Sequence, residues 1–218
     1  MSCLKAALFD LDGTLFDTET QYSKFWKCMG EIYIPHIHDF HKLIKGTTLD
    51  SIFNTYFPND IDRKIITQKL DEWEYNMSYK FVDGAHDFVS QLNQLGVKCA
   101  VVTSSNQKKV ECVRRTNADL DILFNDIITS EMVLRSKPFP DCFYLAAKKM
   151  QVAADECVVF EDSINGLRAA KNANMFTIGL ATTINKDILM KFCDFFINDF
   201  TEISYSLLID LFNHNNIL

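Results

Sequence analysis

The stretch Lys5-Ala-Ala-Leu-Phe-Asp10-Leu-Asp12-Gly13-Thr14 contains a short apolar run that ends in a cluster of polar residues. An apolar run of this length, followed by turn-forming residues, predicts a parallel strand that is buried on both faces. We therefore predict a strand over residues 5–10, whose carboxyl end opens into a polar loop. The fold class depends on which later strands of the chain pair with this one.

A long helical segment follows the first strand. Apolar side chains recur at helical spacing in three groups: Phe25, Trp26 and Met29; Leu49, Ile52, Phe53, Tyr56 and Phe57; and Ile61, Ile65, Ile66, Leu70, Trp73 and Met77. Three or four amphipathic helices without an intervening strand predict a separate helical unit, which we place at residues 18–80.

Strands and helices alternate over the remainder of the chain. We predict further strands at residues 97–103, 126–129, 157–161, 176–180 and 195–197. Helices are predicted at residues 85–95, 107–115, 141–150 and 164–173, with a closing helix after residue 203. This alternation is typical of a doubly wound parallel sheet. Residues 1–17 and 81–218 are therefore expected to form one Rossmann-like α/β core, with the helical unit of residues 18–80 inserted as a second domain.

Length and composition agree with this division and exclude several classes of protein. At about 150 residues per domain, a chain of 218 residues corresponds to one domain with a large insertion or to two unequal domains. The 48% apolar and 23% charged residues are ordinary globular values, which excludes disorder, collagen and coiled coil. A net charge of −7 would repel a phosphate backbone, so no nucleic-acid partner is expected.

The sequence also bears on localisation and on cysteine chemistry. No apolar run approaches the length of a membrane span, and Asp10 and Asp12 occur before a signal-peptide core could form. The seven cysteines are scattered without a Cys-x-x-Cys pair, so we expect reduced thiols and neither a disulfide framework nor a thiolate zinc site. We therefore predict a cytoplasmic protein with no membrane association, and no protein partner is evident.

Polar residues follow the carboxyl ends of three predicted strands, which is where ligands bind to a doubly wound sheet. They are Asp10, Asp12 and Thr14 after the first strand, Thr103, Ser104 and Asn106 after the second, and Glu161 and Asp162 after the fourth. Lys137 adds a cation from a loop, because the following Pro138 biases it away from a helix. Taken singly, each residue has an ordinary explanation as a loop acid, a helix cap or a surface lysine. Their convergence on one crevice is the functional signal.

The carboxylates of this set form an oxygen-only cluster, which is the donor type that Mg²⁺ prefers. Packed together, Asp10, Asp12 and Asp162 would repel one another and be driven toward protonation, so a metal ion or Lys137 is needed to keep them ionised. Thr103 lies where a strand passes into a helix, so hydroxyl and backbone N–H donors point together at an anion. With one aspartate free as a nucleophile, these features predict a phosphoryl site with Mg²⁺ as its cofactor.

Four motifs, in this order, resemble those of the haloacid dehalogenase-like phosphohydrolases. They are Asp10-Leu-Asp12-Gly13-Thr14, Val102-Thr103-Ser104-Ser105, Lys137-Pro138 and Glu161-Asp162-Ser163-x-x-Gly166. More narrowly, Asp17-Thr18-Glu19 and the inserted helices resemble the beta-phosphoglucomutase and sugar-phosphatase branch of that superfamily, which has a helical cap.

The resemblance implies catalytic roles for four residues. Asp10 would attack phosphorus to form an aspartyl phosphate. Asp12 would protonate the leaving oxygen and then activate water, while its backbone carbonyl contacts Mg²⁺. Thr103 and Lys137 would hold phosphoryl oxygens, with Lys137 also neutralising Asp10.

The resemblance also implies the remaining contacts. Asp162 would complete the metal site with Asp10 and Asp12, and Glu161 would ligate directly or through water. Further substrate contacts are expected from Thr14, Ser104 and Asn106. Because haloacid dehalogenases and phosphonate hydrolases of this superfamily lack an aspartate at the position of Asp12, both of these activities are disfavoured.

The resemblance leaves a choice between a phosphatase and a phosphosugar mutase. Lys45-Gly46 is similar to the substrate-loop Lys-Gly of the mutases and would reach the substrate from the insertion. However, the cap histidine of the mutases falls at Tyr22, and their substrate-gripping arginine falls at Leu49. A mutase must hold a bisphosphate, so the loss of an arginine clamp favours a phosphatase acting on a small phosphorylated metabolite.

Two alternatives of another class remain open at this point. A signalling receiver module also pairs an aspartate cluster with Mg²⁺, a hydroxyl and a lysine. However, a receiver needs no helical insertion, and its phosphorylated aspartate follows a strand in the middle of the chain and not the first strand. A catalytically silent relative would bind a phosphorylated ligand without turning it over. The intact pair of Asp10 and Asp12, together with Lys137, argues for catalysis.

Overall fold

A six-stranded parallel sheet lies at the centre of the computed structural model, which describes residues 3–45 and 47–215. Its strand order is β3-β2-β1-β4-β5-β6. The strands are β1 (Ala6–Phe9), β2 (Lys98–Val102), β3 (Asp126–Ile128), β4 (Cys157–Glu161), β5 (Phe176–Leu180) and β6 (Phe195–Ile197). The doubly wound α/β fold predicted from the sequence is thereby confirmed.

The first strand occupies the middle of this sheet, between β2 and β4. Its four residues are fully buried, and their side chains alternate between two hydrophobic layers. Ala7 and Phe9 pack in one layer, and Ala6 and Leu8 pack in the other. A continuous apolar run is therefore required here, because each face of β1 meets a layer of helices.

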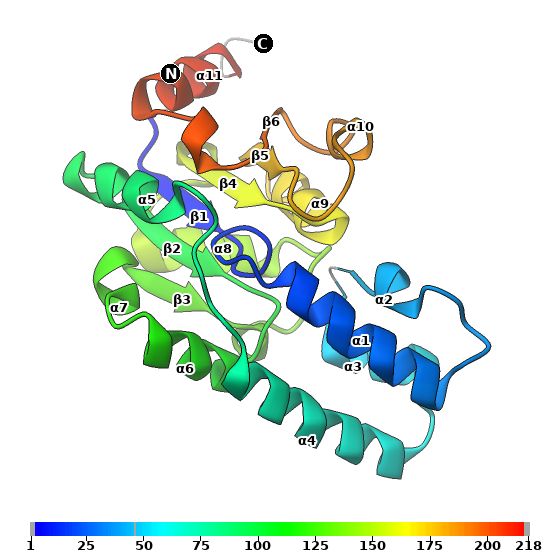
Figure 1. The fold of residues 1–218 in the computed structure, drawn as a ribbon. Helices are drawn as coiled ribbons and strands as arrows, with labels where there is room; N and C mark the ends of the chain where they lie inside the picture. The colour runs from blue at the N-terminus through cyan, green and yellow to red at the C-terminus, as the bar shows by residue number, and fades with distance from the viewer. Residues whose placement is uncertain (1–2, 46, 216–218) are drawn as a thin grey trace.

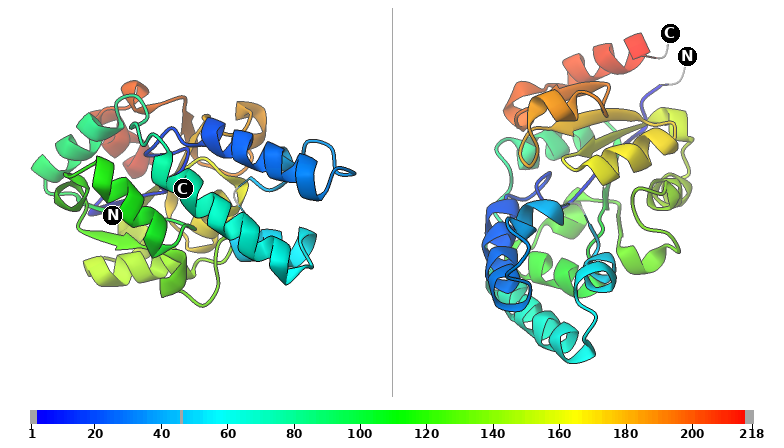
Figure 2. Two further views of the ribbon diagram at one scale, coloured as in Figure 1. Left: turned by 60° about the horizontal axis from the view of Figure 1, so that its bottom comes forward. Right: turned by 90° about the vertical axis from the view of Figure 1, so that its right-hand side faces the viewer.

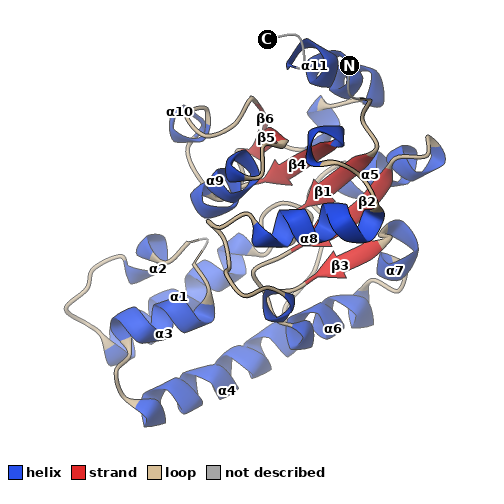
Figure 3. Cartoon of the chain, turned by 180° about the vertical axis from the view of Figure 1, so that it is seen from behind, coloured by secondary structure: helices blue, strands red, loops and turns tan. Residues whose placement is uncertain are grey.

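The two faces of the sheet carry different helices (Figures 1 and 3). One layer contains α5 (Ala85–Gln94), α6 (Gln107–Thr116), α7 (Leu120–Leu123) and α11 (Tyr205–Asn215). The other contains α8 (Asp141–Met150) and α9 (Ile164–Asn172). The remaining elements of this part are α10 (Lys186–Leu189) and the 3-10 turns η1 (Ser130–Met132), η2 (Ala154–Glu156) and η3 (Phe200–Glu202). Within the described ranges, no helix has the length and apolarity needed to span a membrane.

Four helices lie between β1 and α5: α1 (Glu19–Tyr33), α2 (Phe40–Leu43), α3 (Leu49–Tyr56) and α4 (Asp60–Asn76). We call residues 18–80 the helical insertion. It has a hydrophobic cluster of its own, which includes Phe25, Trp26, Phe40 and Ile66. The helices project beyond the carboxyl ends of the strands (Figures 1 and 2). The insertion therefore faces the edge of the sheet where the polar residues gather.

One sequence prediction about α4 is wrong. Ile61 and Ile65 were expected to share a buried face with Ile66 and Leu70, yet they are 67% and 39% exposed. Successive residues of a helix are rotated by about 100°. Ile66 and Leu70, four residues apart, therefore lie on the narrow stripe that meets the other insertion helices, while Ile65 points away from it.

The chain enters and leaves the insertion at neighbouring points. The backbone N–H of Asp17 donates to the carbonyl of Lys80 at 2.9 Å. Phe16 and Phe81 form an antiparallel bridge, with ring centroids 4.4 Å apart. The two connections thus run side by side, a few residues from the end of β1.

Phe9 is expected to be a major contributor to stability. Its buried ring stacks on Phe160 at 4.8 Å between centroids and lies 6.0 Å from Phe124. We predict that Phe9→Ala lowers the free energy of unfolding by about 3–5 kcal/mol, because the truncation leaves a cavity. Urea denaturation measures the change. Ile122→Ala is the control, since this side chain is 83% exposed and should change stability by less than about 0.5 kcal/mol. Equal effects of the two substitutions would contradict the packing argument.

Candidate active site

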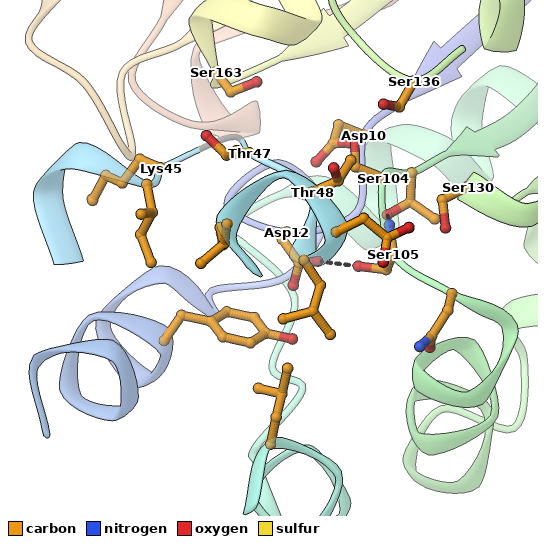
Figure 4. Close-up of a pocket in the computed structure, with 18 of the residues that line it drawn as sticks. Asp10, Asp12, Lys45, Thr47, Thr48, Ser104, Ser105, Ser130, Ser136 and Ser163 are labelled. Carbon is orange, nitrogen blue, oxygen red and sulfur yellow. Dashed lines mark hydrogen bonds between the residues drawn. The ribbon is translucent and has the colours of Figure 1, made fainter. Parts of the chain in front are cut away.

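A cavity of about 550 Å³ lies between the carboxyl edge of the sheet and the helical insertion. The sheet side contributes Asp10, Asp12 and Thr103, and the insertion contributes Lys45 and Leu49. Figure 4 shows Asp10 and Asp12 beside the serines of the core loops, with Lys45 on the other side of Asp12. The predicted convergence of strand-end residues is therefore present in three dimensions.

Lys137 is buried against two carboxylates at the carboxyl edge of the sheet. Its ammonium Nζ lies 2.6 Å from Asp10 Oδ1 and 2.8 Å from Glu161 Oε1, and it donates to the carbonyl of Val102 at 2.9 Å. Lys137 and both carboxylates are buried. The loop before α8 thus places one cation against the ends of β1, β2 and β4.

The carboxylates outnumber this cation. Burial raises the pKa of Asp10 to about 7; Lys137 opposes this shift and the charge of Glu161 adds to it. Although burial disfavours a charged ammonium, Asp10 and Glu161 raise the pKa of Lys137 above its ordinary value. Asp162 is also buried and interacts electrostatically with Asp10 and Glu161, so this edge holds three carboxylates and one lysine that pairs with two of them. The site has an excess of negative charge that a further cation would offset.

Asp162 is held by two hydroxyl groups. Thr14 Oγ1 donates to Asp162 Oδ1 at 2.9 Å, and Thr183 Oγ1 donates to Oδ2. Burial raises the pKa of Asp162, with the charges of Glu161 and Asp10 adding to the shift. Gly13, at a φ of 73°, passes so close that a Cβ there would lie 2.2 Å from Asp162 Oδ2. Glycine is therefore required in this turn.

The position of Thr14 corrects one sequence prediction. Thr14 was expected to contact the substrate, but it is fully buried, and its hydroxyl is committed to Asp162. It is absent from the described residues that line the cavity. The side chain lies behind the carboxylate edge, so Thr14 orients Asp162 and does not reach the cavity.

The donor chemistry fits Mg²⁺, although the side chains are not gathered as a complete ligand set. Among residues 3–45 and 47–215, no three His, Cys, Asp or Glu side chains form a metal-binding group. Both oxygens of Glu161 are engaged, one by Lys137 and the other by the backbone N–H of Ser163 at 2.7 Å. Magnesium commonly takes only one or two carboxylates and completes its shell with water and phosphate oxygens. Asp10 and Asp162, buried and in excess over Lys137, provide such a pair.

Asp12 has a separate set of partners. Thr18 Oγ1 donates to Asp12 Oδ1 at 2.6 Å. Ser105 Oγ donates to Asp12 Oδ2 at 3.0 Å, which is the hydrogen bond drawn in Figure 4. Lys109 Nζ forms an ion pair with Oδ1. Sequence reasoning assigned no role to Thr18, Ser105 or Lys109. The burial of Lys109 could have been inferred from its spacing, because it lies four residues before the buried Val113 and so on the same face of α6.

The loop between β2 and α6 supplies the predicted anion-binding groups. Thr103, Ser104 and Asn106 all line the cavity. The side chain of Asn106 caps α6 by accepting from the N–H of Lys109 at 2.9 Å. Thr103 Oγ1 accepts from the N–H of Ser105 at 3.0 Å and keeps its own proton for donation. The capping role of Asn106 therefore leaves the Thr103 hydroxyl proton available for an anion.

Lys45 lines the cavity from the insertion side. Its ammonium lies 3.0 Å from Glu19 Oε2 and 3.4 Å from the carbonyl oxygen of Thr183. It therefore bridges the insertion and the loop after β5. Gly46, its predicted companion in substrate binding, lies outside the described residues.

Comparison with known proteins places these observations in a family. Residues 7–180 match the model of the haloacid dehalogenase-like hydrolases. The validoxylamine A 7'-phosphate phosphatase of Streptomyces hygroscopicus subsp. limoneus is 28% identical over 207 residues, which cover 92% of this chain and 96% of that protein. The beta-phosphoglucomutase of Bacillus subtilis (strain 168) is 28% identical over 191 residues, which cover 81% of this chain and 83% of the relative.

A solved structure extends the likeness to three dimensions. The crystal structure of a haloacid dehalogenase-type hydrolase, family IA, variant 3, from Entamoeba histolytica HM-1:IMSS superposes with a TM-score of 0.84 at 27% sequence identity. The match covers 96% of this chain and 100% of the other. The helical insertion is thus included in the likeness.

Gly166 is expected to be required beside Glu161. A Cβ at Gly166 would lie 1.6 Å from Glu161 Oε1. Replacing a helical glycine with alanine usually stabilises a protein by about 0.4–1 kcal/mol when the backbone tolerates it. We predict that Gly166→Ala instead destabilises the protein by about 1–3 kcal/mol, because the added methyl group overpacks the site. Urea denaturation tests the sign. In a Glu161→Ala background the penalty should disappear, and its persistence there would show that another contact is responsible.

Proposed function

The chain belongs to the haloacid dehalogenase-like hydrolases, and we propose that it is a Mg²⁺-dependent phosphatase acting on a small phosphomonoester, specifically a sugar phosphate. The observation that carries this proposal is the buried Asp10, paired with Lys137 at 2.6 Å and opening onto a cavity that the insertion covers. The phosphatase and phosphoglucomutase named above as relatives support the substrate class.

Asp10 is the proposed nucleophile. Its carboxylate oxygen forms a bond to phosphorus while the bond to the sugar oxygen breaks, which leaves an aspartyl phosphate and a free alcohol. Lys137 offsets the repulsion between this carboxylate and the anionic phosphate. Thr103 and the backbone N–H groups after β2 donate to phosphoryl oxygens, where charge builds up.

Asp12 is the proposed general acid and base. Its side chain lies two residues beyond the nucleophile, at the same edge of the sheet, and it lines the cavity. It gives its proton to the leaving sugar oxygen, then takes a proton from the water that attacks the aspartyl phosphate. This exchange releases inorganic phosphate and restores Asp10. General acid–base catalysis of this kind contributes roughly 10²–10⁴-fold.

Mg²⁺ is the proposed cofactor. When bound, it would neutralise phosphoryl oxygens and help to orient them for in-line attack. Asp10, Asp162 and the backbone carbonyl of Asp12 would hold it, with Glu161 acting through water. The excess of buried carboxylates over Lys137 supports this assignment, because a divalent cation would offset the remaining negative charge.

We also propose that residues 18–80 act as a cap that excludes water from the reacting groups. Of the described residues that line the cavity, Lys45 is the sole lysine or arginine, and it is paired with Glu19. The insertion side also presents Asp50, Asp71 and Glu74. An acidic wall disfavours the second phosphate of a bisphosphate, so we place phosphosugar mutase activity second. Lys45 itself is the observation in favour of the mutase.

Phosphate release should depend on Mg²⁺ and on Asp10. We expect the protein to release inorganic phosphate from at least one member of a panel of sugar phosphates, nucleotides and glycolate phosphate. Addition of EDTA should stop the release and excess Mg²⁺ should restore it. Asp10→Asn should reduce release to background because the nucleophile is lost, whereas Asp60→Asn, at an exposed position of α4, should retain activity. No turnover of any panel member by the folded protein would refute the proposal.

Phosphate release should outpace isomerisation. With beta-glucose 1-phosphate and a trace of glucose 1,6-bisphosphate, we expect inorganic phosphate to form faster than glucose 6-phosphate, because Leu49 stands where the mutases have an arginine. Coupled assays for the two products give the ratio. Leu49→Arg should shift this ratio toward isomerisation by adding a phosphate-binding cation to the insertion side. Faster isomerisation by the unaltered protein would reverse our ranking.

A further inference from the structure

We propose that Lys109 is a positioning residue that fixes the Asp12 carboxylate and connects it to the helical insertion. This inference rests on the proposed function, because it concerns the group assigned as general acid and base. Lys109 belongs to none of the four motifs that led to the site.

The burial of Lys109 sets it apart from an ordinary helix lysine. Its side chain is 1% exposed, whereas that of the adjacent Lys108 is 64% exposed. A lysine is almost never fully buried unless its charge is paired. The partner here is Asp12 Oδ1, so the buried ammonium of Lys109 on α6 forms its ion pair with the proposed acid–base residue.

Three elements together hold the Asp12 carboxylate. Lys109 contacts Oδ1 from α6, and Thr18 donates to the same oxygen from the start of the insertion. Ser105 donates to Oδ2 from the loop after β2. Both oxygens are therefore engaged, which restricts rotation of the side chain. A proton donor must be held close to the leaving oxygen, and small misplacements of such a group are costly.

Lys109 also contacts the insertion. Its ammonium lies 4.2 Å from the ring centroid of Tyr22 in α1. The Tyr22 hydroxyl donates to Glu74 Oε1 of α4 at 2.6 Å, and Tyr79 donates to the backbone carbonyl of Glu74 at 2.7 Å. Glu74 is itself buried. The cation thus lies between the Asp12 carboxylate of the core and a hydrogen-bonded pair of the insertion.

Two other contacts between the core and the insertion show how Lys109 differs from a residue that only joins these two parts. The core helix α6 and the insertion helix α4 are also joined by an ion pair of Lys108 with Asp71 and by stacking of Arg115 on Tyr75. Figures 1 and 3 show one end of α4 next to one end of α6. Neither of these contacts involves Asp12. Lys109 does not appear among the described residues that line the cavity, so it acts through Asp12 and not on the substrate.

The test uses substrates that differ in their need for a proton. A sugar alkoxide must be protonated as it leaves, whereas p-nitrophenolate leaves without help. Lys109→Met should lower kcat/KM for the best sugar phosphate by at least about tenfold, a part of the roughly 10²–10⁴-fold that general acid–base catalysis supplies. For p-nitrophenyl phosphate, kcat/KM should stay within about twofold of the unaltered protein, because formation of the aspartyl phosphate then needs no acid. Lys109→Arg should restore part of the loss.

Lys108→Met is the matched control. It removes a cation and an α6–α4 contact one residue away, and it should leave the ratio of kcat/KM values for the two substrates unchanged. An equal loss on both substrates in Lys109→Met would overturn the inference and indicate a structural role. If the unaltered protein turns over neither substrate, the proposed function itself fails, which is a distinct result.

A double substitution keeps the test decisive if Lys109→Met does not fold. Removing both partners of a buried ion pair avoids the unpaired charge that makes single substitutions destabilising. If Lys109 acts through Asp12, Asp12→Asn/Lys109→Met should match Asp12→Asn within about twofold in kcat/KM for the sugar phosphate. A further large loss in the double variant would show that Lys109 acts independently of Asp12.

Discussion

The ion pairs of Lys137 with Asp10 and Glu161 are the interaction on which the site depends. Removing one member of a buried ion pair leaves an uncompensated charge. The free energy lost in this way exceeds the free energy that the intact pair contributes to stability. The sheet fixes the partners in advance, since Phe9 and Phe160 are directly paired in β1 and β4 and the next residues are Asp10 and Glu161. The order of the central strands therefore determines which carboxylates share the lysine.

The proposed phosphate site is compatible with the acidic composition of the chain. The chain carries a net charge of −7, yet hydroxyl groups and the amino-terminal end of α6 line the sheet side of its cavity, and the buried Lys137 pairs with the lining residue Asp10. Carboxylates gather around the lysine on this side and also line the insertion side. The cavity therefore has hydroxyl and N–H donors on the sheet side and carboxylates on the insertion side. We propose that this asymmetry favours a single phosphate attached to an uncharged polyol.

The strands and long helices could be predicted because each has a clear hydrophobic period and a polar or glycine boundary. The strand-end residues of the site were equally readable, since parallel strands bring their carboxyl ends to one edge. The direction in which individual side chains point could not be predicted. Thr14 turns behind Asp162, and Lys109 turns inward while Lys108 turns outward, although the two lysines are adjacent. The four-residue helices α7 and α10 are too short to show a repeat.

The paired connections at Phe16 and Phe81 have an evolutionary consequence. Because Asp17 and Lys80 are hydrogen-bonded to each other, we expect that the length of the segment between them can change without altering the spacing of β1 and α5. If the proposed roles hold, the sheet edge and the helical insertion can diverge at separate rates, so that substrate recognition changes in one segment of the gene while the reaction chemistry in the other stays constant. The hydrogen-bonded base also makes the helical insertion a natural unit for recombination between related chains.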